Sequence, residues 1–135
     1  MRNVVLDASV VVAAALKRDS IPERALLLAR AHDRIWLSSA VIEEIRGVLD
    51  RPKFVRYLDR ARIDVILDLL VGASRLVEPG ERVTDCRDPK DDRYLELALT
   101  ANAEIIVSSD EDLRVLHPWR GVAILSPADY VAGFA

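Results

Sequence analysis

Short apolar runs rich in Val and Ile alternate along this chain with longer segments of helical periodicity, and this alternation constrains the fold most. The predicted strands are residues 3–7, 34–38, 74–79, 104–109 and 121–126. Most of them are apolar at consecutive positions, which is typical of parallel strands that are covered on both faces. The sequence therefore predicts an α/β fold, with three α/β/α layers around a central parallel sheet of about five strands.

Helices are predicted between these strands. They cover residues 9–16, 22–31, 39–50, 60–73, 91–102, 110–116 and 127–135. Pro22 suits the first turn of its helix, and Pro52 marks a break between two helices. The chain contains no internal repeat, no low-complexity stretch and no long linker. We therefore expect one domain over residues 1–135.

Composition indicates an ordinary globular chain. Hydrophobic residues make up 51% of the chain and charged residues 30%. The net charge is −3, which gives no indication of nucleic-acid binding. The single cysteine, Cys86, cannot form an internal disulfide, which favours a reducing cytoplasm. The longest apolar stretch, residues 8–16 around Ser9, falls short of the roughly 20 residues that span a bilayer. We expect no membrane association.

Two acids stand at the ends of predicted strands. Asp7 closes the first strand, and Asp110 follows the fourth. In open parallel sheets, ligands bind outside the carboxyl ends of the strands, where the strand order reverses. Each aspartate could instead simply cap the helix that follows it. Taken singly, capping is the simpler interpretation.

Helical phase distinguishes two further acids from their neighbours. Glu44 lies at the border of the apolar stripe of its helix, whereas Glu43 falls on the opposite side. Asp91 lies in line with the buried stripe of the next acidic helix, and Asp92 is expected to face water. A first-turn acid also complements the helix dipole, but that role does not explain an inward direction.

These acids can converge if the first and fourth strands are neighbours. The candidate site residues are Asp7, Glu44, Asp91 and Asp110. Crowded carboxylates repel one another and would otherwise have to take up protons. A divalent cation removes this conflict, and an all-oxygen ligand set favours Mg²⁺ or Mn²⁺.

Other chemistry finds little support in the sequence. His32 and His117 are far apart and Cys86 stands alone, so no Cys/His metal site is expected. We find no glycine-rich phosphate loop and no nucleophile elbow. This chain lacks residues that a receiver-type signalling domain or a phosphohydrolase with an aspartate nucleophile would need. Ser9, for example, stands where the phosphohydrolase requires an acid.

Four motifs in order carry a family resemblance: "LDAS", "SSAVIEEIRGVL", "DPKDDRYLELA" and "IIVSSDEDL". Together they resemble the PIN-domain ribonucleases, most closely the single-domain toxins of prokaryotic toxin–antitoxin pairs (VapC-like). The resemblance covers nearly the whole chain and matches the same four acids. It also matches two hydroxyl residues, Ser9 and Ser108, the latter in place of a more usual threonine.

The resemblance implies a metal-dependent endoribonuclease that uses carboxylate-held Mg²⁺ or Mn²⁺. Its products would carry 5′-phosphate and 3′-hydroxyl ends. It implies a cognate antitoxin protein as a partner and allows a homodimer. The alternative within the family is a catalytically silent PIN module that binds protein.

A basic segment is the candidate RNA-binding surface. Its residues are Arg46, Arg51, Lys53, Arg56 and Arg60, followed by Arg62. Phe54 and Tyr57 are interleaved with them and could stack on unpaired bases. The alternatives are a solvated helix surface with both aromatics in the core, or a surface that receives a partner protein.

Overall fold

The computed structural model describes residues 1–56 and 59–134, without the side chains of Phe54 and Val55. Its strands are β1 (Asn3–Leu6), β2 (Arg34–Leu37), β3 (Ser74–Leu76), β4 (Ile105–Val107) and β5 (Ala123–Leu125). They form one sheet in the order β3-β2-β1-β4-β5, and every pair is parallel. The predicted α/β fold and its five-stranded parallel sheet are confirmed.

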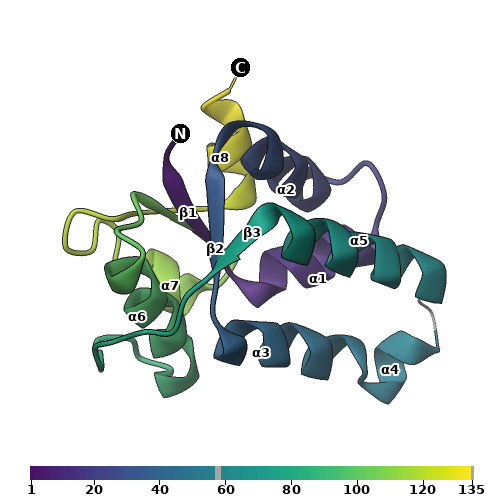
Figure 1. The fold of residues 1–135 in the computed structure, drawn as a ribbon, viewed down its shortest axis with the longest axis horizontal. Coiled ribbons are helices and arrows are strands. Elements are labelled where there is room, and N and C mark those ends of the chain that lie inside the picture. Colours follow the sequence, from purple (N-terminus) through teal and green to yellow (C-terminus); the bar gives the residue numbers. More distant parts are fainter. Residues whose placement is uncertain (57–58, 135) are drawn as a thin grey trace.

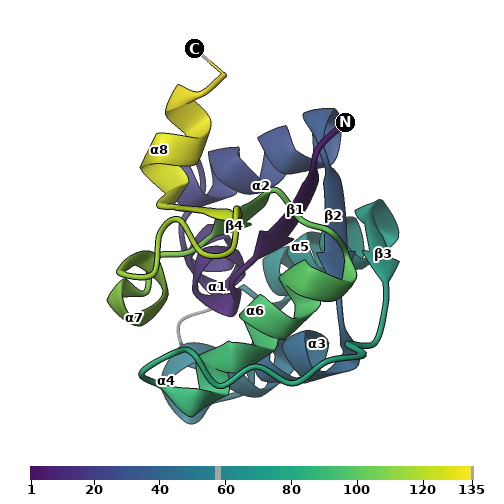
Figure 2. The same ribbon diagram turned by 90° about the vertical axis from the view of Figure 1, so that its left-hand side faces the viewer.

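Helices cover both faces of this sheet (Figures 1 and 2). They are α1 (Ala8–Leu16), α2 (Ile21–His32), α3 (Ser39–Leu49), α4 (Pro52–Val55), α5 (Arg60–Ala73), α6 (Asp92–Thr100), α7 (Glu111–Arg114) and α8 (Pro127–Ala132), with a 3-10 turn η1 (Pro89–Asp91) before α6. Helices α1, α2 and α5 lie on one face and α6 on the other. The short α4 and η1 were not predicted, because a single turn leaves no periodic pattern. Within the described residues, no helix has the length and apolarity needed to cross a bilayer.

The centre of the sheet positions the site. Strand β1 lies between β2 and β4, so the chain leaves β1 toward one edge and later returns to build the other. Leu6 pairs with Val107, and the amide of Asp7 donates to the carbonyl of Val107 at 2.9 Å. Asp7 and Ser108 therefore leave adjacent strands at the same level, at the point where the strand order reverses.

A buried acid fixes the opposite end of the molecule. Asp33, at the end of α2, is 5% exposed and accepts two hydrogen bonds from Arg2, both at 3.1 Å. It also accepts a hydrogen bond of 2.5 Å from the hydroxyl of Tyr130 in α8. These contacts tie the first residues and α8 to α2, because a buried carboxylate is stable only when paired.

This arrangement makes the Tyr130 hydroxyl important for stability. Tyr130→Phe removes one donor from a buried, ionised acceptor, and such hydrogen bonds contribute about 1.5–3 kcal/mol. We expect the free energy of unfolding to fall by that amount in denaturant titrations, with an unchanged slope. An unchanged midpoint would show that Arg2 alone satisfies Asp33.

Candidate metal centre

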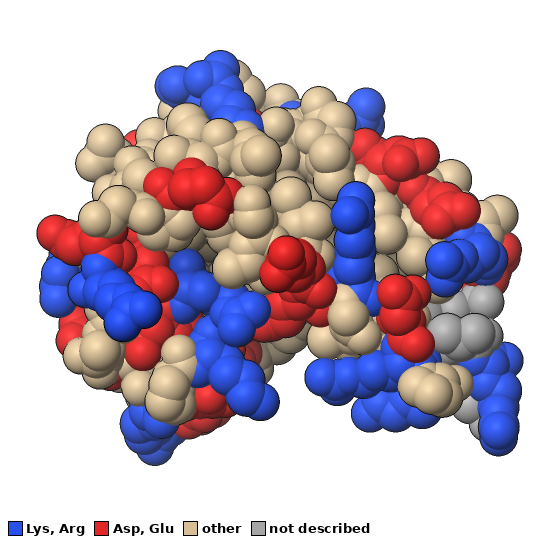
Figure 3. Space-filling model, turned by 60° about the horizontal axis from the view of Figure 1, so that its bottom comes forward, with Lys and Arg blue, Asp and Glu red and all other residues tan. Residues whose placement is uncertain are grey.

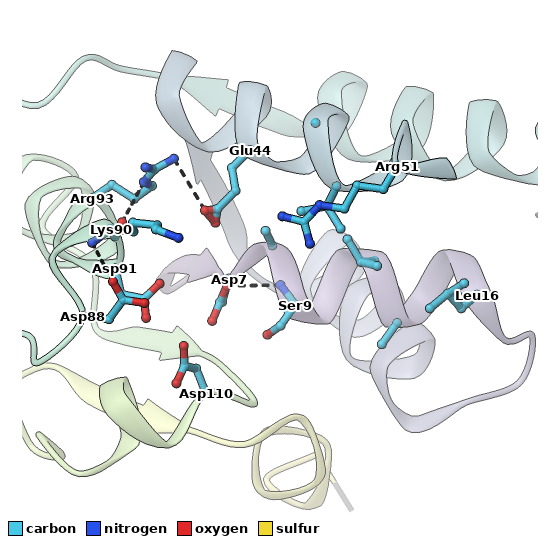
Figure 4. Close-up of a pocket in the computed structure, with 15 residues that line it drawn as sticks. Asp7, Ser9, Leu16, Glu44, Arg51, Asp88, Lys90, Asp91, Arg93 and Asp110 are labelled. Atoms are coloured by element: carbon cyan, nitrogen blue, oxygen red, sulfur yellow. Dashed lines mark hydrogen bonds and ion pairs between the residues drawn. The ribbon is translucent and has the colours of Figure 1, made fainter. Parts of the chain in front are cut away.

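A cavity of about 680 Å³ opens at the carboxyl ends of β1 and β4, between α1, α3 and the start of α6 (Figure 4). Its acidic lining residues are Asp7, Glu44, Asp88, Asp91 and Asp110. The structure thus brings together all four acids that the sequence singles out. Asp88 is a fifth acid, which the sequence analysis missed.

Asp7 is buried at the floor of this cavity and is 4% exposed. Its Oδ1 accepts from the amide of Ser9 at 3.1 Å, which caps α1. Its Oδ2 accepts from the hydroxyl of Ser108 at 2.6 Å. Asp7 is therefore a helix cap and also a cavity residue, so the two interpretations of this acid do not exclude each other.

Ser108 links Asp7 to Asp110. Its side chain is fully buried, and its Oγ accepts from the amide of Asp110 at 2.9 Å while donating to Asp7. Asp110 caps α7 by accepting from the amide of Asp112 at 2.9 Å. The other predicted hydroxyl, on Ser9, lines the cavity and accepts from the amide of Ser109 at 3.5 Å.

Glu44 reaches the cavity from α3, and its neighbour Glu43 is exposed, as the helical phase predicts. The fully buried Tyr94 donates its hydroxyl hydrogen to Oε1 of Glu44 and accepts from the amide of Ala8 at 3.1 Å. Burial, more than the nearby acids, raises the pKa of Tyr94, so this hydroxyl stays a donor. Arg93 lies 3.5 Å from the other Glu44 oxygen. No local pattern in the sequence reveals that Tyr94 orients Glu44.

Asp91 is 7% exposed, and its Oδ2 has no hydrogen-bond partner among the described residues. The expectation that Asp92 faces water is wrong, because Asp92 is only 8% exposed. Its Oδ1 accepts from the amide of Cys86 at 2.9 Å. The irregular chain before η1 packs over the start of α6 and covers Asp92, which helical phase alone does not predict.

A tighter acidic group lies beside the predicted four. One oxygen from each of Asp88, Asp91 and Asp112 lies within 4.8 Å of the others, so these three residues could hold a metal ion. Asp88 also accepts from the amide of Lys90, and Asp112 lies 2.9 Å from Arg87. The available sequence signal was spacing, because Asp88 stands three residues before Asp91, and Asp112 two residues after Asp110.

Basic side chains gather on two sides of a hollow, with acidic ones between them (Figure 3). Of the predicted RNA-binding residues, Arg51 lines the cavity. Two further basic residues that were not predicted, Lys90 and Arg93, line it as well. Arg46 and Arg60 line a separate hollow. Lys53 and Arg56 are exposed at and just after α4.

Arg62, the last of the predicted basic residues, does not extend this surface. Arg62 is half-buried and donates to the carbonyls of Ala14 and Ala15 at the end of α1. The side chain of Phe54, and Tyr57 as a whole, lie outside the described residues.

Crowding and burial disfavour the charged carboxylates. Burial is the main cause that raises the pKa of Asp7, with Glu44 and Asp110 adding to it and the Ser108 hydrogen bond opposing it. The pKa of Asp91 is raised to about 8, first by burial, then by the Asp110 carboxyl group, and then by Asp7 and Asp88. In the absence of a cation, the native state therefore favours a protonated Asp91 at neutral pH.

The pKa of Asp91 predicts how stability depends on pH in EDTA. It rises from 3.8 to about 8 on folding, so between these values the native state binds more protons than the unfolded state. The contribution of Asp91 to stability is therefore complete below about pH 4 and is lost as pH rises toward 8. Melting temperatures of wild type and Asp91→Asn, measured from pH 5 to 8, should diverge in favour of the variant. Parallel curves would contradict the raised pKa.

Comparisons with known proteins identify the family. A PIN domain family model matches residues 3–112. The uncharacterized protein MJ1680 of Methanocaldococcus jannaschii is 30% identical over 113 residues, which cover 82% of this chain and 72% of that protein.

Two crystal structures share the fold. PAE2754 from Pyrobaculum aerophilum has a TM-score of 0.63 and 18% identity, and the match covers 97% of this chain and 88% of that one. The structure of VapBC2 from Rickettsia felis, bound to a DNA fragment from its promoter, has a TM-score of 0.60 and 15% identity. The match covers 92% of this chain and 98% of that one. The family predicted from the four motifs is confirmed, and the chain belongs to the PIN domain family.

Proposed function

We propose that this PIN domain is a metal-dependent endoribonuclease, and that Asp7, Glu44, Asp91 and Asp110 are its catalytic metal ligands. The observation that carries the proposal is the convergence of five carboxylates on one cavity, where Asp91 is buried and its Oδ2 accepts no hydrogen bond from the described residues. An unpaired acceptor at such a position is costly unless a ligand satisfies it.

The residues present suit a hard divalent cation. Every candidate ligand atom is a carboxylate oxygen, which favours Mg²⁺ or Mn²⁺ over softer ions. Asp88 and Asp112 lie close enough to Asp91 to extend the ligand set. When bound, such cations activate water and neutralise charge on a phosphodiester.

The chain's own groups hold the ligands in place. Ser108 and the Ser9 amide orient Asp7, and the Tyr94 hydroxyl orients Glu44. Partners of this kind fix the direction of a ligand before the metal arrives. The described lining residues include no histidine or cysteine, so the proposed chemistry depends on carboxylates alone.

RNA is the proposed substrate, and basic residues are proposed to hold its phosphates. Arg51 and Lys90 are exposed at the cavity, whereas Arg93 lies beside Glu44. The other predicted RNA contacts, Arg46, Lys53, Arg56 and Arg60, lie outside the cavity lining and would bind flanking nucleotides. Phosphate contacts of this kind position a strand without reading its sequence.

A toxin role with a cognate antitoxin is the finer part of the proposal. Its support is the resemblance of the four motifs, together with the fold that the chain shares with VapBC2. The second candidate is a catalytically silent module that binds protein. The complete set of acids in the cavity favours the enzyme, because a silent module needs no ligand set.

Melting curves test the metal ligands. Asp7→Asn and Asp110→Asn lower the repulsion, so both variants should melt higher than wild type in EDTA. They should also lose most of the Mn²⁺ shift, which is about 2.7 kcal/mol at 100 times the dissociation constant. Asp59→Asn is the matched control, since Asp59 caps α5 through the Ala61 amide but does not line the cavity. Retention of the full Mn²⁺ shift in both variants would assign these acids to capping alone.

Cleavage of single-stranded RNA tests the activity. Glu44→Gln should reduce kcat/KM by at least about 100-fold, on the scale of lost metal affinity or activity at such sites. Glu43→Gln is one residue away on the exposed face and should behave as wild type. Asp7→Asn should be inactive while remaining folded. Equal activity in both glutamate variants, or no Mn²⁺-dependent cleavage by wild type, would favour the silent module.

A further inference from the structure

Two helices present matched stripes to the cavity. The residues of α1 are Ser9, Val12, Ala13 and Leu16, and those of α3 are Glu44, Gly47 and Val48, with Arg51 two residues after the helix ends. Both sets follow the i, i+3, i+4, i+7 spacing of one helix face. The acids lie at one end, apolar residues follow, and Arg51 extends from beyond α3 toward the space between the helices (Figure 4). The cavity therefore has an acidic half and an apolar half.

Gly47 faces open space in the apolar half. It lies in the interior of α3, where glycine is the least favourable residue after proline. A Cβ built at this position would meet no atom within 4 Å, so packing does not require the glycine. Across the cavity, Leu16 is 45% exposed, although it is a large aliphatic residue. The chain thus forgoes both helix propensity and apolar burial at the same place.

We propose that this apolar half, formed by Val12, Ala13, Leu16, Gly47 and Val48, is a subsite for one unpaired nucleobase of the RNA substrate. The proposal rests on the proposed function. A nucleotide matches the cavity in chemistry, because its phosphate would bind a cation held by the acids and its flat base suits the apolar walls. Arg51, exposed next to both, can contact a flanking phosphate or the face of the base.

The geometry favours an unpaired strand. A base inside a duplex is stacked and paired, so it cannot enter a groove between two helices without being extruded. An apolar segment of a protein could also cover Leu16 and Val48. Such a segment fits the acidic half only if it also carries a cationic side chain, whereas a single nucleotide bound through a cation fits both halves. One amphipathic ligand that spans both halves accounts for the whole lining.

The test compares ligands with and without a base. With Mn²⁺ present, calorimetry should show that wild type binds adenosine or uridine 5′-monophosphate about 5- to 10-fold more tightly than ribose 5-phosphate, at the low end of stacking effects. Gly47→Leu should fill the subsite and abolish this preference. It should keep wild-type affinity for ribose 5-phosphate and the full Mn²⁺ melting shift, because it leaves every acid intact.

Gly72→Leu is the matched control. Gly72 lies in α5 outside the cavity, and a Cβ there also meets no atom within 4 Å, so the same change should preserve the preference. Leu16→Ser makes the opposite wall polar at a partly exposed position. It should weaken the preference for nucleotide over ribose 5-phosphate even if Gly47→Leu folds poorly.

The outcomes separate the subsite from the catalytic proposal. A preference that survives both Gly47→Leu and Leu16→Ser, or a wild type that binds nucleotide and ribose phosphate equally, would overturn the subsite and leave the apolar half to a protein partner. A wild type that shows the preference but cleaves no RNA would uphold the subsite as a nucleotide site and contradict only the proposed catalysis.

Discussion

The hydrogen bond from Ser108 to Asp7 joins the two strands on which the site depends. It lies directly beyond the Leu6–Val107 pair, so the register of β1 against β4 decides whether it forms. A slip of one residue would turn each side chain to the opposite face and bury the wrong groups. The core residues of these strands, such as Val5 and Ile106, are fully buried and hold that register. The hydrophobic core and the acidic cavity are therefore specified together.

Local geometry explains how several acids can occupy one place in a stable fold. Asp7, Asp88 and Asp110 each cap a helical segment, and each accepts from the amide two residues further on through Oδ1. Three short-range turns thus help to aim three carboxylates into the cavity, and the long-range hydrogen bond from Ser108 adds to the turn at Asp7. The amides at these caps also offset part of the repulsion. Asp91 lacks a side-chain capping hydrogen bond, and it is the acid whose pKa rises to about 8.

How far the sequence predicts this structure depends on the range of the interactions. Strand position, helical phase and the convergence of the acids follow from the periodicity of apolar residues, because burial of one face in the core imposes that periodicity. The environment of Asp92 depends on irregular chain that packs over α6, and no local pattern encodes that packing. Proximity in sequence also misleads: Arg51 lines the cavity, Arg60 pairs with Asp50 at 3.6 Å, and Arg62 binds the end of α1.

Three departures from local optima line one cavity. Gly47 weakens α3, Leu16 stays partly exposed, and the buried Oδ2 of Asp91 has no hydrogen-bond partner among the described residues. Each departure costs stability in the isolated chain, and all three residues line the same cavity. Elsewhere buried acids are paired, as Asp33 is by Arg2 and Tyr130. A helix-interior glycine and an exposed leucine also occur away from the cavity, at Gly72 and Leu76, so the buried Asp91 oxygen is the departure that most directly indicates a ligand. A cation at the acidic half and a base at the apolar half would compensate all three.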